Sequence, residues 1–190
     1  ELGLEVPVRV AVMGVNSRGN QLARVFAQSP GCDVTVICDV DARAAERTRE
    51  TVVQAGGAAP QLVPDIRQVV ESGDVDALVI AAPDHWHAPA ALMALQAGKH
   101  VYVEKPCSHN PREGELLVEA ARRSGLVVQM GTQRRSWPNV REAIAEVQGG
   151  RIGRVYLAPT WYANTRASIG RGKVTPVPEW LDWDLWQGPA

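Results

Sequence analysis

Apolar runs of strand length alternate with amphipathic stretches of helical length from Val8 to Gln148. The pattern predicts strands at residues 8–13, 33–38, 61–63, 76–82, 100–104 and 126–131. It predicts helices after residue 18 and at residues 41–55, 65–71, 91–97, 110–124 and 137–148, with capping residues such as Asp41 and Gly125 at their ends. Strands and helices that alternate in this way form a parallel sheet covered on both faces. The sequence therefore predicts an α/β fold, a Rossmann-type doubly wound parallel sheet.

The composition changes after residue 148. Glycines stand at positions 149, 150 and 153, and five of the six tryptophans lie beyond residue 136. The stretch from Arg154 to Tyr162 has the composition of a strand, and L-D-W-D-L-W at residues 181–186 is typical of a turn or an interface rather than of a catalytic acid pair. We expect one domain over residues 1–150, and over residues 151–190 the beginning of a truncated α/β domain whose tryptophans face a partner surface.

A glycine turn, G-V-N-S-R-G, joins the first predicted strand to its helix. Gly14 allows a sharp bend, Asn16 tolerates a positive φ, and Gly19 lets helix and strand approach closely. The amides at the helix start can then bind a pyrophosphate. The expected cofactor contacts of this turn are Gly14, Asn16, Ser17, Arg18 and Gly19. Asparagine replaces the second glycine of the G-x-G-x-x-G pattern, and an ordinary βαβ turn is the alternative.

Asp39 ends the second predicted strand, twenty residues after Gly19. A carboxylate at this position accepts hydrogen bonds from a ribose diol and repels a 2′-phosphate. The predicted cofactor is therefore NAD, and NADP is disfavoured.

Further polar residues follow the later strands, in P-D-H-W-H-A-P, E-K-P and T-Q-R-R. Ligands of open α/β sheets bind beyond the carboxyl ends of the strands. Additional cofactor contacts are therefore expected from Pro83, Asp84, His87, Glu104, Lys105 and Gln133. For the residues from Asp84 to His87, a helix N-cap with packed histidines is the alternative.

Lys105 is the candidate catalytic residue. Pro106 follows it and restricts it toward an extended conformation. An ammonium group there can polarise a substrate hydroxyl and share its proton while hydride leaves for a nicotinamide. Glu104 can pair with Lys105 or orient it, and a surface salt bridge is the alternative reading of this pair.

No metal site is predicted. His85 and His87 have alternate spacing but no further ligand cluster nearby in the sequence, and the same holds for Cys107 and His109. The three cysteines show no paired spacing, so free thiols are expected.

The charge balance gives no reason to expect nucleic acid or a membrane as a partner. Twenty basic and twenty-one acidic side chains give a formal net charge of −1. No apolar run is long enough to span a bilayer, and E-L-G-L-E-V-P is not a signal peptide. The localisation stays open between the cytoplasm and export by a leader that precedes residue 1.

Several motifs together resemble the Gfo/Idh/MocA family of glucose–fructose oxidoreductase and inositol dehydrogenase. They are G-V-N-S-R-G, C-D-V-D, A-A-P-D-H-W-H-A-P, A-L-Q-A-G-K-H-V-Y-V-E-K-P and G-R-I-G-R-V. The resemblance implies a Rossmann domain that holds NAD or NADP, an open mixed-sheet domain after it, and oxidation of a sugar or polyol between the two. Lys105 matches the family lysine near the nicotinamide and the reacting hydroxyl, and Glu104 matches the acid beside it. The family cofactor residues fall on Gly14, Asn16, Gly19 and Asp39.

The family's members are considerably longer, and its D-x-x-x-H motif, whose histidine serves as acid or base, is absent from this chain. We expect the cofactor-binding part of a dehydrogenase that takes a small-molecule carbohydrate and forms a homo-oligomer in its full-length form. Two other functions stay open. One is an NAD-dependent glycoside hydrolase or lyase of the same family, and the other is a non-catalytic dinucleotide-binding module.

Overall fold

A computed structural model describes residues 6–163, 165–168 and 170–189 of the chain. Its six strands are β1 (Val8–Met13), β2 (Cys32–Cys38), β3 (Gln61–Val63), β4 (Ala77–Ile80), β5 (His100–Glu104) and β6 (Val128–Gly131). Its helices are α1 (Arg18–Ala27), α2 (Ala42–Gln54), α3 (Ile66–Glu71), α4 (Asp84–Gln96), α5 (Pro111–Ser124), the 3-10 helix η1 (Gln133–Ser136), α6 (Pro138–Gln148) and α7 (Trp183–Gln187).

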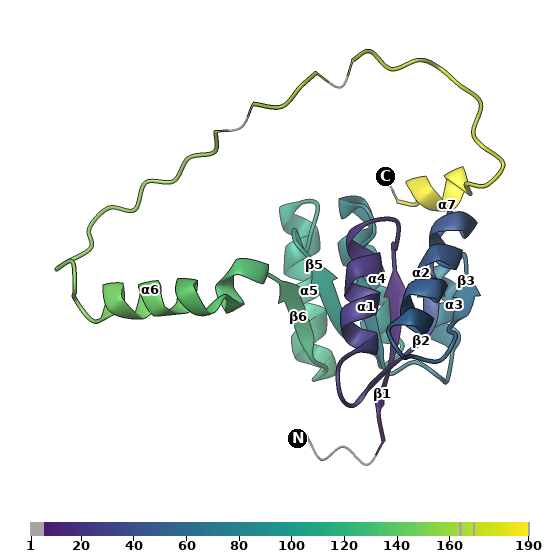
Figure 1. Ribbon diagram of the computed structural model, residues 1–190, viewed down its shortest axis with the longest axis horizontal. Coiled ribbons are helices and arrows are strands. Elements are labelled where there is room, and N and C mark those ends of the chain that lie inside the picture. The colour runs from purple at the N-terminus through teal and green to yellow at the C-terminus, as the bar shows by residue number, and fades with distance from the viewer. Residues whose placement is uncertain (1–5, 164, 169, 190) are drawn as a thin grey trace. The chain divides into compact units, whose positions relative to one another are not determined.

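The six strands form one parallel sheet in the order β3-β2-β1-β4-β5-β6 (Figure 1). The chain starts in the middle, builds one half outward through β3, and returns to build the other half from β4. The order therefore reverses between β1 and β4, which is where open α/β sheets bind ligands. The predicted doubly wound Rossmann fold is confirmed.

Successive side chains of each strand pack into two different hydrophobic layers, one on each face of the sheet. Val10 and Val12 of β1 pack with α1 and α2, whereas Ala11 and Met13 belong to the layer beneath α3, α4 and α5. The alternation follows from the two-residue period of a strand, since successive side chains point to opposite faces. Because both faces are covered, the central strands are apolar along their length.

Charged side chains join the amino ends of the central strands. Arg9 of β1 donates through Nη2 to Asp76 Oδ1 at 2.7 Å and through Nε to Asp76 Oδ2 at 3.0 Å. Lys99 is buried before β5, and its Nζ donates to the carbonyl oxygens of Ser72 and Val75. These contacts stabilise the amino ends of the strands. The carboxyl ends, at the opposite edge of the sheet, take no part in them and can form a ligand site.

The chain divides into two compact units, Glu1–Gly131 with Val177–Ala190, and Thr132–Pro176. The first holds the whole sheet, helices α1 to α5 and α7. The second holds η1 and α6, followed by residues 149–176 without helix or strand where the structure describes them. The assignment of residues 151–190 to a substrate domain stays a prediction.

The strand predicted from Arg154 to Tyr162 is wrong. These residues are exposed and belong to no strand in the structure. A strand exists through the hydrogen bonds of a neighbouring strand, and none lies beside this stretch among the described residues. Composition alone could not supply that neighbour.

No helix within the described part of the chain is both long and apolar enough to cross a membrane.

Candidate functional site

The glycine turn brings the start of α1 against the end of β4. Gly14 has φ +79°, and a Cβ built on it would lie 2.3 Å from the backbone nitrogen and Cα of Ala82. A Cβ on Gly19 would lie 2.2 Å from the carbonyl oxygen of Gly14. The bend predicted at Gly14 and the close approach predicted at Gly19 are therefore both present, and no larger side chain fits either position.

Asn16 does not use the positive φ that its residue type tolerates. Among the described residues, Gln133 alone combines a side chain larger than glycine's with a positive φ. The amide oxygen of Asn16 instead accepts a hydrogen bond from Arg47 Nη2 at 2.8 Å. Ser17 precedes α1, and its hydroxyl does not cap the helix. The side chains of Asn16 and Ser17 thus leave the helix amides open to an anion.

Asp39 lies directly after β2, and backbone amides fix its carboxylate. Oδ2 accepts from Val15 N–H at 2.6 Å and Oδ1 accepts from Asp41 N–H at 2.8 Å. Burial raises the pKa of the Asp39 carboxyl, and the two amide donors lower it, which offsets part of that rise. Each oxygen keeps a further lone pair, so the carboxylate can also accept from a ligand's hydroxyl groups.

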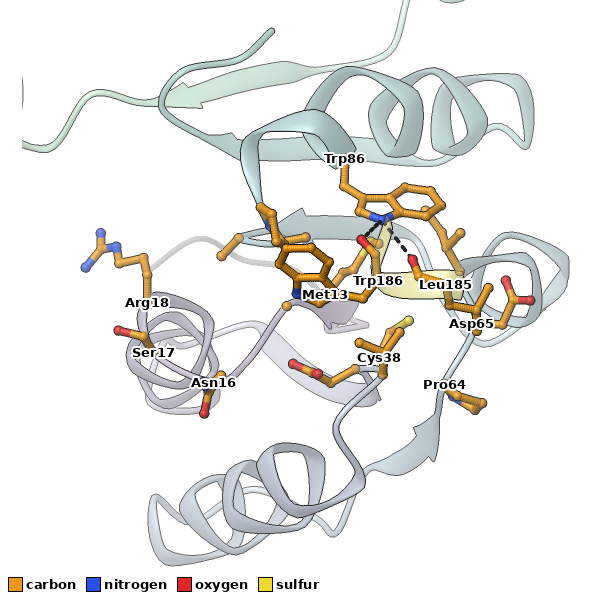
Figure 2. Close-up of a pocket in the computed structure, with 17 residues that line it drawn as sticks. Met13, Asn16, Ser17, Arg18, Cys38, Pro64, Asp65, Trp86, Leu185 and Trp186 are labelled. Carbon is orange, nitrogen blue, oxygen red and sulfur yellow. Dashed lines mark hydrogen bonds between the residues drawn. The ribbon is translucent and has the colours of Figure 1, made fainter. Parts of the chain in front are cut away.

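A cavity of about 340 Å³ opens at the carboxyl ends of the strands around the point where the strand order reverses (Figure 2). Asp39 supplies a carboxylate to its wall, and Asn16 and Ser17 from the turn lie beside it. Gly14, Arg18 and Asp65 line it as well, and the remaining wall is apolar: Met13, Cys38, Val40, Pro64, Ile66, Ala81, Ala82, Pro83 and Trp86. A largely apolar cavity with a few fixed polar groups is typical of a small-molecule or cofactor site.

Residues far along the chain complete this cavity. Leu185 and Trp186 of α7 line it together with Trp86 of α4. The indole Nε1 of Trp86 donates to the carbonyl oxygen of Leu185 at 3.0 Å, as Figure 2 shows, and His85 Nε2 lies 2.9 Å from the carbonyl oxygen of Trp186. Sequence reasoning expected a partner surface for the tryptophans of residues 151–190, of which Trp183 and Trp186 lie on α7. The structure instead packs α7 onto the Rossmann unit of the same chain.

Glu104 is buried at the end of β5 and pairs with Arg18. Arg18 Nε donates to Glu104 Oε1 at 2.9 Å, so the glycine turn is tied to the strand that carries Lys105. Glu104 thus pairs with Arg18 rather than with Lys105, and its other suggested role, orienting Lys105, stays a prediction. Lys105 is exposed, and its side chain makes no hydrogen bond or ion pair with the part of the chain that the structure describes. Its ammonium group stays available to a ligand, and the peptide bond to Pro106 is cis.

His87 holds two strand exits together. Its ring is buried, with Nε2 at 2.8 Å from the carbonyl oxygen of Ala82 and Nδ1 against that of Pro106. Both ring nitrogens are thus engaged by the protein, which differs from the direct cofactor contact expected from sequence. Asp84 opens α4 and is exposed, and Pro83 rather than Asp84 is the N-cap residue.

Five other residues predicted to contact the cofactor do not line this cavity: Gly19, Asp84, His87, Glu104 and Lys105. Gln133 is exposed at the start of η1 in the second unit, and its role as a cofactor contact stays a prediction. Within the described ranges, no group of three or more histidine, cysteine, aspartate or glutamate side chains is placed to hold a metal ion.

The fold and the cavity define a dinucleotide-binding type of protein, and comparison with known sequences gives the family. A family model described as "Oxidoreductase family, NAD-binding Rossmann fold" matches residues 8–132. Because that match covers more than half of the chain, the chain belongs to the Gfo/Idh/MocA family of oxidoreductases. The resemblance noted in the motifs is confirmed.

Curated relatives carry two kinds of name. Inositol 2-dehydrogenase 4 of Saccharopolyspora erythraea is 32% identical over 165 residues, which are 86% of this chain and 47% of that protein. A glycosyl hydrolase family 109 protein of the same organism is 36% identical over 121 residues, 62% of this chain and 26% of that protein. The chain thus spans about a quarter to a half of these relatives.

Solved structures repeat the fold. Myo-inositol 2-dehydrogenase of Lactobacillus plantarum has a TM-score of 0.71 at 24% identity, over 78% of this chain and 43% of that one. Scyllo-inositol dehydrogenase of Lactobacillus casei, solved with NAD(H) and scyllo-inositol, has a TM-score of 0.68 at 23% identity, over 77% and 42%. A 3-ketoreductase of Actinomadura kijaniata, solved with NADP, has a TM-score of 0.68 at 28% identity, over 78% and 46%.

Proposed function

We propose that this chain holds NAD and serves a dehydrogenase that oxidises a hydroxyl group of a cyclic polyol or sugar. The observation that carries the proposal is the Asp39 carboxylate, fixed by two amides at the wall of a cavity next to the Gly14 turn. The turn at Gly14 has no room for a side chain, and the backbone amides at the start of α1 lie next to this turn. A pyrophosphate at the turn and a ribose at Asp39 match this arrangement.

The charges around Asp39 support the proposed preference for NAD over NADP. A 2′-phosphate would stand against a fixed carboxylate, which repels it. A second cavity, which shares Asn16, Asp39, Val40 and Trp186 with the first, is also lined by two arginines. Arg43 pairs with Asp41, and Arg47 donates to Asn16. Because both guanidinium groups already bind other side chains, their attraction for a 2′-phosphate is weakened. The NADP found with a relative at 28% identity is the counter-example that a binding test must address.

Lys105 is proposed to act on the substrate hydroxyl. The nicotinamide supplies the hydride acceptor when the cofactor is bound. An exposed ammonium at the exit of β5 can donate a hydrogen bond to the hydroxyl oxygen and stabilise the negative charge that develops on it, while the hydroxyl proton leaves to solvent water. Glu104, anchored to Arg18, would set the position of the strand end that carries Lys105. Gly14, Asn16, Ser17, Arg18, Gly19 and Pro83 are proposed as cofactor contacts.

The substrate class rests on a relative that is matched over 86% of this chain and is named an inositol 2-dehydrogenase. A second candidate function is NAD-dependent glycoside cleavage, favoured by the family 109 relatives. In that reaction the sugar would be oxidised and later re-reduced, so no NADH would accumulate.

The test is a turnover assay with NAD and a panel of inositols, sugars and aryl glycosides, on this chain and on any longer chain that contains it. NADH absorbance that needs Lys105 supports the dehydrogenase. Release of the aglycone without net NADH supports the hydrolase instead. Lys105→Ala should abolish turnover and leave NAD binding nearly unchanged, whereas Lys173→Ala, an exposed lysine of the second unit, is the matched control. Full activity in Lys105→Ala would contradict the assigned role.

A further inference from the structure

The segment before the end of the chain is anchored on the residues that follow Asp39. Leu181 forms an antiparallel bridge with Asp41, and Asp182 N–H donates to the carbonyl oxygen of Val40 at 3.3 Å. The guanidinium of Arg43 lies 3.3 Å from the ring centroid of Trp180, a cation–π contact. This end of the segment is therefore fixed beside the carboxylate proposed to bind a ribose.

A second anchor lies across the cavity, at the start of α4. The indole of Trp86 and the imidazole of His85 both meet carbonyl oxygens of α7. Gly188 packs so closely that a Cβ there would lie 2.3 Å from Trp86 Cζ2. The segment thus runs from the exit of β2 to the exit of β4, the two strand ends between which the cavity opens. We call residues 180–188 the strap.

The strap places an aromatic ring at the cavity. Trp186 stacks on Trp183 with ring centroids 4.8 Å apart and an angle of 10° between the planes, and it lines the cavity with Asp39. It is still 37% exposed, although its backbone is held on both sides. A held, partly open indole beside apolar walls and a carboxylate suits a flat base joined to a ribose.

We propose that Trp186 forms the outer wall of the adenosine half of the cofactor site, with its indole against the purine. Through the strap, residues that follow the sheet in the sequence then belong to the cofactor site. This inference rests on the proposed function, since it requires a dinucleotide in this cavity. The adenosine half is the relevant one because Asp39 and the end of β3 lie at this cavity, whereas Lys105 lies at the exit of β5 and does not line it.

The test compares dissociation constants for NAD and for ADP-ribose in the unchanged chain and in Trp186→Ala, Trp186→Phe and Trp161→Ala. Loss of base–aromatic stacking weakens binding by about tenfold or more. Trp186→Ala should weaken both ligands alike, because both carry adenosine, and Trp186→Phe should restore most of the affinity. Trp161 is exposed in the second unit, so Trp161→Ala should bind as the unchanged chain does.

Gly188→Ala provides a second, independent variant, since its methyl group would push the strap away from Trp86 with Trp186 intact. It should weaken NAD binding as well, and circular dichroism should show the sheet and helices of each variant unchanged. Equal affinity in Trp186→Ala, with binding that still depends on Asp39, would overturn the strap proposal alone. Tighter binding in Trp186→Ala would also overturn it, because the indole would then stand in the purine's place. An unchanged chain that binds neither ligand would overturn this proposal and the proposed function together.

Discussion

The ion pair between Arg18 and Glu104, 2.9 Å from Nε to Oε1, joins the first residue of α1 to the last residue of β5. Glu104 is buried, and Arg18 is about one-third exposed. The pair therefore fixes the distance between the turn proposed to bind the pyrophosphate and the lysine proposed to act on the substrate. One side of the site is positioned by a contact that no short sequence motif contains.

Removing the guanidinium should destabilise the chain. Arg18→Met leaves the Glu104 carboxylate buried without its cation, which costs up to about 3 kcal/mol in the free energy of unfolding, reduced from the fully buried case because Arg18 is partly exposed. Urea unfolding followed by circular dichroism measures this change. The double variant Arg18→Met with Glu104→Gln should recover much of the loss, because it no longer buries an unpaired charge. An unchanged midpoint in Arg18→Met would contradict the account.

The Gly14 turn should tolerate no side chain. Gly14→Ala puts a methyl group 2.3 Å from the backbone of Ala82, at a φ that residues other than glycine rarely adopt. We expect a loss of stability of about 2 kcal/mol or more and at least tenfold weaker NAD binding. Gly73→Ala is the matched control, since no atom lies within 4 Å of its Cβ and its φ is not positive. Equal NAD affinity in Gly14→Ala and Gly73→Ala would contradict the claim that the Gly14 turn lies close to the cofactor.

Stability should fall in acid through Asp76. The side-chain hydrogen bond from Arg9 lowers the pKa of the Asp76 carboxyl from 3.8 to about 2. A carboxyl whose pKa is depressed on folding contributes stability above its unfolded pKa and loses it as the pH falls through the folded value. Stability should therefore decline between about pH 4 and pH 2, and less steeply in Asp76→Asn than in the unchanged chain. Asp33→Asn, at an exposed carboxylate that does not pair with Arg9, is the control, and equal slopes in all three proteins would contradict the pairing.

The parts of the fold that follow local rules could be predicted from sequence, and α5 illustrates this. Asn110 accepts from Glu113 N–H at its start, and Gly125 takes a left-handed conformation at its end, as their residue types indicate. The glycine turn and Asp39 could be predicted for the same reason, because each directly follows one strand in the sequence. Contacts between distant residues could not.

Trp186 and the strand expected from Arg154 to Tyr162 depend on residues that are far away in the sequence, and a local sequence pattern does not contain such contacts. Trp186 reaches the cavity only after the chain has passed through the second unit, and nothing near it in sequence signals a site. The tryptophan spacing was the one available signal, and it pointed to an interface without naming the surface. The expected strand failed because strand formation depends on a neighbour rather than on composition.

The measurement that tests the central claim most directly is a calorimetric titration of this chain with NAD and with NADP, repeated with Asp39→Asn and with Asp33→Asn. Asp33 is an exposed carboxylate of β2, the strand that Asp39 follows, and serves as the control. The account predicts tighter binding of NAD than of NADP, and a ratio that shifts toward NADP by about tenfold in Asp39→Asn because a charged acceptor is lost. NAD affinity should also fall as acid neutralises the Asp39 carboxyl, whose pKa burial raises. A ratio that stays the same in Asp39→Asn, or no binding of either nucleotide, would contradict the account.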